Sequence, residues 1–187
     1  MQPTNPLEKA LLDYVRVLRC PPPSANTHST TDLNWLPLFW LDISQRARQA
    51  LLRKYEIETV KVRSVPDGDG LNITRTQKVR YLGIDAPEIG AKGYVAQPFS
   101  LTAKRFNARL VKGRTVQLIR GSAQDTDPNG RLLRHVFVGN YWINVAILLT
   151  GLAWPAFLEQ QEPTIQKLLQ GSARRAQKEH LGLWRYP

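Results

Sequence analysis

Two short acidic motifs contain the side chains with which this sequence could carry out metal chemistry. The first is Pro-Asp-Gly-Asp-Gly at residues 66–70, and the second is Asp-Ala-Pro-Glu at residues 85–88. A hairpin turn centred near Gln77 would place Asp69 opposite Asp85, because antiparallel pairing is symmetric about the turn. Two adjacent carboxylates repel each other, whereas a hard dication accepts their oxygens, at about 2.3–2.6 Å for calcium. The spacing therefore predicts a site for Ca²⁺ or a similar ion.

Each motif also suits a purely structural role. Asp and Gly are the residues that tight turns require, and Asp-Ala-Pro-Glu could be a strand end followed by a turn with solvated acids. The distribution of charge favours the metal site, because residues 57–187 carry nineteen basic but only ten acidic side chains, and four of the ten lie in these motifs. One geometric condition remains. Arg80 and Asp85 would face opposite sides of a regular strand, so a bend or bulge near Gly83 is needed.

The overall composition favours a polyanionic partner. The formal net charge is +11, which suits nucleic acid or an acidic membrane surface, although a merely basic protein fits the charge equally well. The longest apolar run near the N-terminus, residues 35–41, is far shorter than the ~20 residues of a membrane-spanning helix. The first twenty residues lack the layout of a secretory signal, which favours a cytoplasmic location. Cys20 is the single cysteine, which excludes an intrachain disulfide and a thiolate metal site.

The elements that must position these residues follow from hydrophobic periodicity and turn residues. The sequence predicts helices over 6–19, 42–55, 97–111, 141–150 and 164–178, a linker over 21–33, and strands over 57–65, 71–75, 78–84, 115–120 and 132–138. This order suits a mainly β or α+β fold, a five-stranded Greek-key barrel of the OB type with three helices. Other small α+β folds suit it equally. We expect a domain at 57–187 and an N-terminal helical extension with a Pro-rich linker at 1–56.

Three motifs together resemble the staphylococcal nuclease family. They are Val-Pro-Asp-Gly-Asp-Gly-Leu-Asn-Ile at 65–73, Val-Arg-Tyr-Leu-Gly-Ile-Asp-Ala-Pro-Glu at 79–88 and Asp-Pro-Asn-Gly-Arg at 127–131, in the family's order and spacing. Shorter matches continue it at Asn144-Val-Ala, Gly151-Leu-Ala and Leu181-Gly-Leu-Trp. The resemblance runs from about residue 57 to the C-terminus, and each motif alone is weak evidence.

The resemblance implies a Ca²⁺-dependent nuclease that hydrolyses DNA and RNA and leaves 3′-phosphate ends. By residue, it implies that Asp69 and Asp85 bind one Ca²⁺ through their side chains and that the backbone carbonyl of Ala86 supplies a third oxygen. Threonine is usual in the family at the Ala86 position, but a main-chain ligand survives that change.

The resemblance also assigns the catalytic side chains. Glu88 matches the carboxylate that orders or activates the attacking water, and Arg80 and Arg131 match the guanidinium pair that binds the scissile phosphate. These roles agree with the chemistry, because attack on a phosphodiester builds negative charge on its oxygens, which a metal ion and two guanidinium groups stabilise. The planar arginine fork donates two parallel hydrogen bonds to phosphate.

Trp154 and Phe157 are candidates for an aromatic face on which a base of a single strand stacks. Alternatively, both rings belong to the core or to the packing of the barrel rim. Phe157 stands where the family usually has a tyrosine, and Gly70 replaces a threonine beside the first ligand. Pro128 and Asn129 stand where the best-known member has a lysine and a tyrosine, which predicts weaker or differently selective nucleotide binding.

Two alternatives remain open. The chain could be a catalytically weak or inactive module of this family that binds nucleic acid or a protein partner, although such modules typically lose the acidic ligands or the arginines. Residues 1–56 resemble nothing in the family, and they could form a helical cap packed by Trp35, Phe39 and Trp40, a dimer contact or a tether.

Overall fold

The computed structural model describes residues 5–18, 35–90, 93 and 95–185. Its five α-helices are α1 (Pro6–Leu18), α2 (Trp35–Leu52), α3 (Ser100–Val111), α4 (Ile143–Leu149) and α5 (Pro163–Lys178). Its strands are β1 (Ile57–Lys61), β2 (Gly70–Asn72), β3 (Lys78–Tyr81), β4 (Ile84–Asp85), β5 (Thr115–Ile119), β6 (Leu132–Val138), β7 (Tyr141–Trp142) and β8 (Trp154–Pro155). Two short 3₁₀ helices, η1 (Leu158–Gln160) and η2 (Gly182–Trp184), flank α5. The linker predicted over 21–33 lies outside the described residues.

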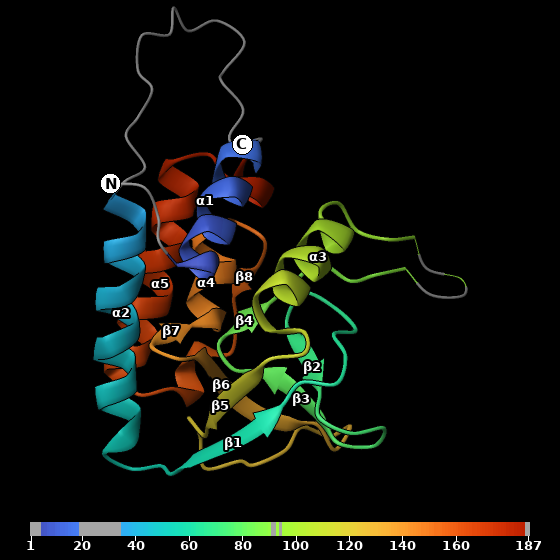
Figure 1. The fold of residues 1–187 in the computed structure, drawn as a ribbon, viewed down its shortest axis with the longest axis vertical. Helices are drawn as coiled ribbons and strands as arrows, with labels where there is room; N and C mark the ends of the chain where they lie inside the picture. Colours follow the sequence, from blue (N-terminus) through green and yellow to red (C-terminus); the bar gives the residue numbers. More distant parts are fainter. Residues whose placement is uncertain (1–4, 19–34, 91–92, 94, 186–187) are drawn as a thin grey trace, which may run out of the picture.

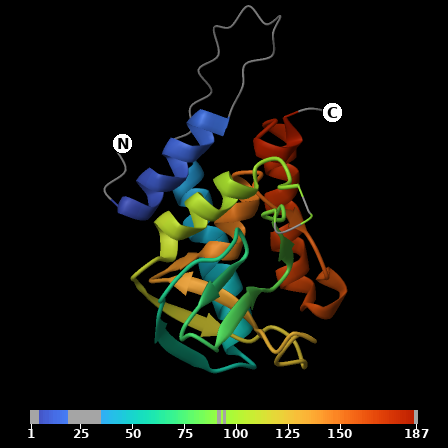
Figure 2. The ribbon, with the colours of Figure 1, turned by 90° about the vertical axis from the view of Figure 1, so that its right-hand side faces the viewer.

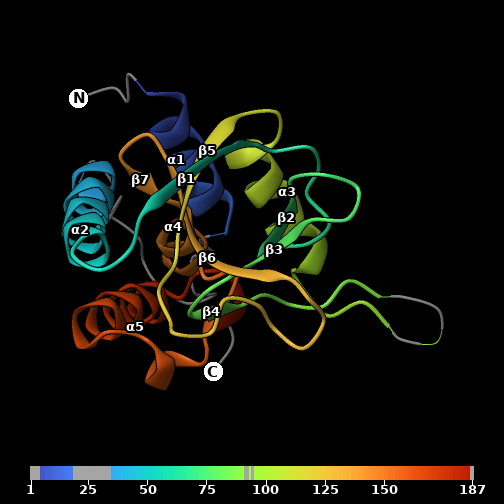
Figure 3. The same ribbon diagram turned by 90° about the horizontal axis from the view of Figure 1, so that it is seen from below.

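The main sheet is mixed and strongly curved (Figure 3). Its strands run in the order β1-β5-β6-β3-β2, with β7 attached to β6, and β4 and β8 form a separate pair. β3 and β6 pair in parallel, whereas the other strand pairs are antiparallel. Beyond β1 the chain returns to the far edge of the sheet, where Ser64 and Asn72 form an isolated bridge. This arrangement agrees with the predicted α+β fold of the OB type, although no continuous ladder closes a barrel in the described part of the chain.

The helices cover one end of the sheet (Figure 1). α4 lies centrally and packs against α3, α5 and β6. Its seven residues are all buried, because the segment Ile-Asn-Val-Ala-Ile-Leu-Leu has apolar side chains on every face. In the part of the chain that the structure describes, no helix has both the length and the apolar character needed to cross a membrane.

The two N-terminal helices pack onto this core as a cap. α2 lies along β7 and α5 (Figure 1), and the fully buried Trp40 donates a hydrogen bond from Nε1 to the backbone oxygen of Trp142 at 2.9 Å. Trp142 N in turn donates to Ser44 Oγ at 2.9 Å. These contacts agree with the helical cap among the alternatives for this segment, while the domain boundary at residues 56 and 57 stays a prediction. The Trp35 side chain lies outside the described residues.

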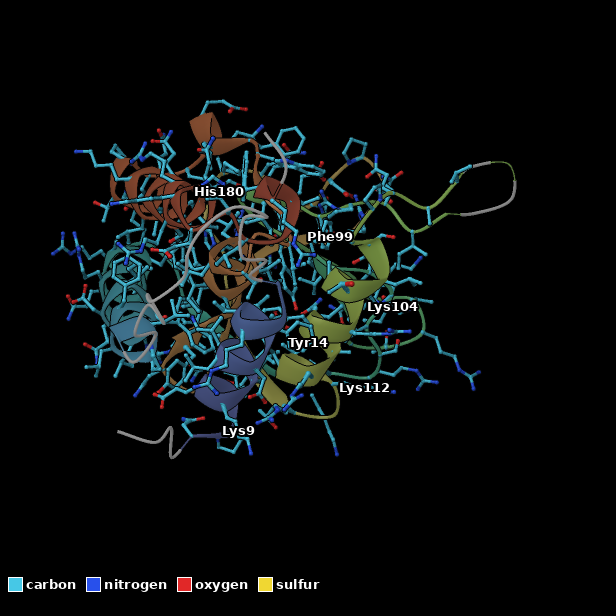
Figure 4. All side chains as sticks on the ribbon, turned by 90° about the horizontal axis from the view of Figure 1, so that it is seen from above. Lys9, Tyr14, Phe99, Lys104, Lys112 and His180 are labelled. Carbon is cyan, nitrogen blue, oxygen red and sulfur yellow. The ribbon has the colours of Figure 1, made fainter. Side chains whose placement is uncertain are left out.

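α1 packs beside α3, as Figure 2 shows. Tyr14 of α1, labelled in Figure 4, lies on the side of α1 that faces α3. Its ring packs at a tilt on that of Phe106 with a centroid separation of 4.7 Å, and Asp13 forms an ion pair with Arg109 at 3.1 Å. The N-terminal segment therefore contacts both sides of the helical layer.

Several predicted element boundaries were wrong: for example, the strand predicted over 57–65 ends at Lys61 and the helix predicted from residue 97 begins at Ser100. α2 begins at Trp35 rather than near residue 42, because a proline at position 37 is tolerated in the first turn of a helix. The predicted helix over 141–150 begins only at Ile143, since Tyr141 and Trp142 pair with β6 as β7. The predicted strand over 78–84 is split into β3 and β4 by a turn at Leu82 and Gly83.

Candidate functional site

The β2–β3 hairpin sets the position of the first carboxylate. Gly70 pairs with Arg80 and Asn72 pairs with Lys78, so the turn is centred at Arg75 and the predicted register about Gln77 was wrong. The Thr74 hydroxyl explains the shift, because it accepts a hydrogen bond from Gln77 N at 2.9 Å and closes a tighter turn.

Asp69 consequently lies beside Tyr81, whose backbone N donates to Asp69 O at 2.8 Å, and not opposite Asp85 in the ladder.

A turn at Gly83 nevertheless brings the two acidic motifs together. Gly83 has φ +75°, a conformation that side chains disfavour, and a Cβ there would collide with Cδ1 of Leu169 on α5. After this turn Ala86 N donates to Asp69 Oδ2 at 2.7 Å, which links the second motif directly to the first. The bend predicted near Gly83 is thus confirmed.

Arg80 joins both carboxylates. Its Nη1 lies 2.7 Å from Asp69 Oδ2, and its Nη2 donates a hydrogen bond to Asp85 Oδ1. The Asp69 side chain is 2% exposed and Arg80 13% exposed, whereas Asp85 is 45% exposed. Solvent exposure therefore increases along the site from the Asp69 carboxylate, through the Arg80 guanidinium group, to the Asp85 carboxylate.

Burial dominates the electrostatics of Asp69. It raises the pKa of this carboxyl to about 7, against the opposing effects of the Arg80 charge and the Ala86 N–H. Burial also acts to lower the pKa of Arg80, but the carboxylates of Asp69 and Asp85 outweigh it and raise that pKa. One guanidinium group thus compensates the buried negative charge only in part.

Asn107, which the sequence did not indicate, holds the backbone of the first acidic motif by hydrogen bonds. This fully buried residue of α3 donates from Nδ2 to the backbone oxygens of Asp67, at 3.2 Å, and Gly70, at 3.0 Å. Its Oδ1 accepts the Tyr81 hydroxyl at 2.9 Å. Asn107 therefore fixes the turn that carries Asp69, and its place beside Ala103 and Phe106 on the apolar side of the helix was the available signal.

Arg131 reaches the same region from the start of β6. It donates to Asp127 from its backbone N, at 2.9 Å, and from Nε, at 2.6 Å. Although burial acts to raise the pKa of Asp127, these hydrogen bonds lower it. An open cleft of about 290 Å³ is lined by Arg80, Asp85, Arg131 and Phe157 together with residues of the 124–129 loop. Both predicted arginines therefore line one cleft.

The remaining predicted residues lie around this cleft. Glu88 is exposed and does not line it; its backbone N donates to Gln97 Oε1 at 2.8 Å. Trp154 on β8 pairs with Asp85 on β4 and is 37% exposed, and Phe157 is 61% exposed. Neither ring lies in the core.

The chemistry of the donors suits a hard cation. In the described ranges, no group of three or more His, Cys, Asp or Glu side chains is arranged to hold a metal. Two carboxylates joined by one guanidinium group, with the Ala86 backbone bonded to one of them, instead offer oxygen ligands to a cation that completes its shell with water. The fit is to an oxygen-ligated dication.

Sequence comparisons with known proteins find relatives of this chain. The sequence profile of the family described as staphylococcal nuclease homologue matches residues 78–186, more than half of the chain. A thermonuclease of Staphylococcus intermedius is 28% identical over 130 residues, which cover 68% of this chain and 76% of the relative. The SPbeta prophage-derived endonuclease YokF of Bacillus subtilis (strain 168) is 29% identical over 132 residues, covering 69% of this chain and 45% of the relative.

A shorter match has higher identity. A probable endonuclease lcl3 of Schizosaccharomyces japonicus (strain yFS275 / FY16936) is 44% identical over 57 residues, which are 30% of this chain and 24% of the relative. The family profile covers both arginines of the cleft, Asp85 and Glu88, and begins after Asp69. With its mixed α+β sheet and this match, the chain belongs to the staphylococcal nuclease family.

Proposed function

We propose that this protein is a Ca²⁺-dependent nuclease that hydrolyses phosphodiester bonds of DNA and RNA and leaves 3′-phosphate ends. The observation that carries the proposal is the meeting of Arg80, Arg131 and Asp85 in one cleft, with Asp69 buried beneath Arg80. Membership of a family whose members include a thermonuclease and endonucleases supports the same reaction class.

Asp69 and Asp85 would hold the ion through their carboxylates, and Ala86 through its backbone oxygen. When bound, the ion supplies positive charge to the phosphate oxygens and acidifies coordinated water. Asp85 is the ligand at the solvent side, while Asp69 is the fixed one, because its Oδ2 is already positioned by Ala86 N.

Arg80 and Arg131 would bind the scissile phosphate from two strands. Arg80 donates a hydrogen bond to Asp85, and both side chains line the cleft. A bound phosphate oxygen would take the place of Asp85 as the acceptor of this hydrogen bond. Arg131 is oriented by Asp127 through Nε, which leaves its terminal nitrogens to donate to phosphate. Preorganised donors of this kind stabilise charge that develops in the transition state.

Glu88 and the exposed rings complete the proposal. The exposed Glu88 carboxylate, whose backbone is fixed by Gln97, would position the attacking water. Phe157 at the cleft wall and Trp154 beside Asp85 would stack on bases. Stacking requires unpaired bases, so we expect a preference for single-stranded substrate.

A digestion assay tests the proposal. Purified protein with CaCl₂ should degrade heat-denatured DNA and RNA, EDTA should abolish the activity, and end-group analysis should find 3′-phosphates. A known calcium-dependent nuclease in the same buffer is the control. If both substrates stay intact while the control enzyme cleaves them, the protein is not the proposed enzyme.

A second candidate is a weakly active or inactive module that binds nucleic acid. The pairing of Arg80 with both carboxylates favours it, because the guanidinium group competes with a cation for these oxygens. Oligonucleotide binding that EDTA leaves unchanged, without cleavage, would support the module over the enzyme.

A further inference from the structure

A second hollow adjoins the cleft. It has a volume of about 180 Å³ and is lined by residues of the β2–β3 hairpin and by Arg131, which also lines the cleft. The lining residues are Pro66, Asp67, Gly70, Asn72, Lys78, Val79 and Arg131. Because Arg131 stands between the two depressions, a chain that passes over it can enter both.

Strand pairing places the cations of both depressions on one face of the sheet. Gly70, Arg80 and Leu133 lie in one row across three strands. Two residues along the strands on the same face, Asn72 pairs with Lys78. Arg131 directly precedes Leu132, the first residue of β6 that pairs with β3, and therefore lies next to Lys78. Residues two apart on a strand share a face and stand about 6.6 Å apart. Lys78 therefore lies one row from Arg80, a separation close to that of consecutive phosphates in a nucleic-acid strand.

Gly70 lines the hollow at a position where the backbone is closely approached. A Cβ at Gly70 would stand 2.7 Å from Asp67 Oδ1, closer than real Cβ atoms come, and 3.0 Å from Val79 O, which is tighter than most real Cβ contacts. The resemblance to the family places a threonine at this position. In this chain the residue at this position lines the hollow with backbone atoms alone.

The electrostatics of the hollow favour an anion near Lys78. This side chain is exposed and forms no ion pair among residues 5–18, 35–90, 93 and 95–185. Asp67 is the acidic residue of the lining, and its charge acts on Arg80, whose pKa it helps to raise. Its Oδ1 is buried without a hydrogen-bond partner, so it forms no bond to Lys78. Lys78 thus presents an uncompensated positive charge, strengthened by the neighbouring Arg131.

We propose that this hollow is a second phosphate subsite, in which Lys78 binds the backbone phosphate next to the one held by Arg80 and Arg131. The inference rests on the proposed function and specifies how the substrate strand runs: along the β2–β3 hairpin rather than only toward Phe157. The ligand is a substrate with at least two consecutive phosphodiesters, and a substrate with one phosphodiester does not reach Lys78.

Kinetics with two substrates test the subsite. The variants are Lys78→Gln and, as a matched control with the same change of charge, Lys112→Gln at the exposed end of α3 (Figure 4), which lines neither depression. For a short single-stranded oligonucleotide, Lys78→Gln should lower kcat/KM about tenfold, the lower end for a contact to a charged group. For a p-nitrophenyl phosphodiester of a single nucleoside, both variants should match the wild type.

The outcomes separate the two proposals. If the wild type cleaves both substrates and Lys78→Gln behaves like Lys112→Gln on the oligonucleotide, the subsite is wrong and the nuclease stands. If Lys78→Gln loses activity equally on both substrates, Lys78 acts at the scissile phosphate and the subsite is again wrong. If the wild type cleaves neither, the proposed function itself has failed.

The salt dependence of binding gives a readout that needs no catalysis. Fluorescence anisotropy with a labelled single-stranded oligonucleotide in EDTA gives the association constant K at several salt concentrations. Lys78→Gln should reduce the magnitude of the slope of log K against log salt by about 0.7, as expected for one lost phosphate contact. Lys112→Gln should keep the wild-type slope. Equal slopes for all three proteins would overturn the subsite even if the protein proved to be a binding module.

Discussion

Arg80 and Asp69 form a buried ion pair, with Nη1 of the arginine 2.7 Å from Oδ2 of the aspartate. The pair lies where β2 meets β3 and is continued by Ala86 N, which donates to the same carboxylate oxygen at 2.7 Å. A single oxygen of Asp69 therefore connects the hairpin, the Arg80 guanidinium group and the second acidic motif. Changes at this oxygen should alter stability and metal binding together.

Replacing Arg80 by Gln should destabilise the metal-free protein. Breaking a buried pair by removing one partner costs about 3–5 kcal/mol, and we expect the lower end because Asp69 can take up a proton. The free energy of unfolding in urea with EDTA measures this loss. Calcium affinity by titration calorimetry should rise in the variant, since Arg80 no longer competes for the carboxylates; unchanged or weaker affinity would contradict their role as ligands.

Calcium should stabilise the wild-type protein against unfolding through Asp69 and Asp85. At a calcium concentration 100 times Kd the gain is about 2.7 kcal/mol, because the ion binds the folded state only. Asp85→Asn keeps the shape of the half-exposed side chain but removes its charge, so the gain should largely disappear. Thermal unfolding with and without CaCl₂ measures it. An equal shift in Tm for both proteins would exclude Asp85 as a ligand.

His135 should make stability depend on pH in the acid range. It is fully buried on β6, hydrogen-bonded to Gln161 at 2.9 Å, and burial lowers its pKa from 6.5 to about 4. Between these values the unfolded chain binds the proton and the folded chain does not. The contribution of His135 to stability is therefore highest above pH 6.5 and falls toward pH 4, by up to about 3 kcal/mol, whereas the raised pKa of Asp69 acts in the opposite direction.

The contribution of His135 can be isolated by comparing the wild type with His135→Gln. The slope of unfolding free energy against pH between 6.5 and 4 should be smaller in the variant. Identical slopes in urea unfolding would assign the acid sensitivity to other groups.

The N-terminal cap should stabilise the fold without entering the site. Trp40 is fully buried and packs on Tyr141 with a ring-centroid separation of 4.6 Å. Trp40→Ala should therefore cost about 3–5 kcal/mol, as large core truncations do. Leu38→Ala on the exposed face of the same helix should change stability by less than about 0.5 kcal/mol.

Nuclease assays well below Tm should give the same kcat/KM for these two variants and the wild type. A selective loss in Trp40→Ala would instead place the cap in the function of the cleft.

The sequence predicted the hairpin from two short strands around a polar turn, and it predicted the bend near Gly83 because Arg80 and Asp85 would face opposite sides of a regular strand. The hairpin register was missed, since a threonine side chain closed the turn and local turn chemistry outweighed the expected symmetry. The two motifs met all the same, because Gly83 returns the chain to Asp69 through a turn rather than through the ladder. The hydrogen bonds from Asn107 to the turn at Asp67 and Gly70 were missed, because the periodicity of a helix does not indicate which loop a buried amide side chain contacts.

The position of the second acidic motif depends on the last helix. Leu169 of α5 occupies the space where a side chain at Gly83 would stand. The turn that positions Asp85 is therefore packed against a residue from a helix much later in the sequence. During synthesis, a chain that has not yet released α5 from the ribosome lacks this support. The carboxylate pair is therefore assembled only after α5 has packed against this turn, which makes the site a late product of folding.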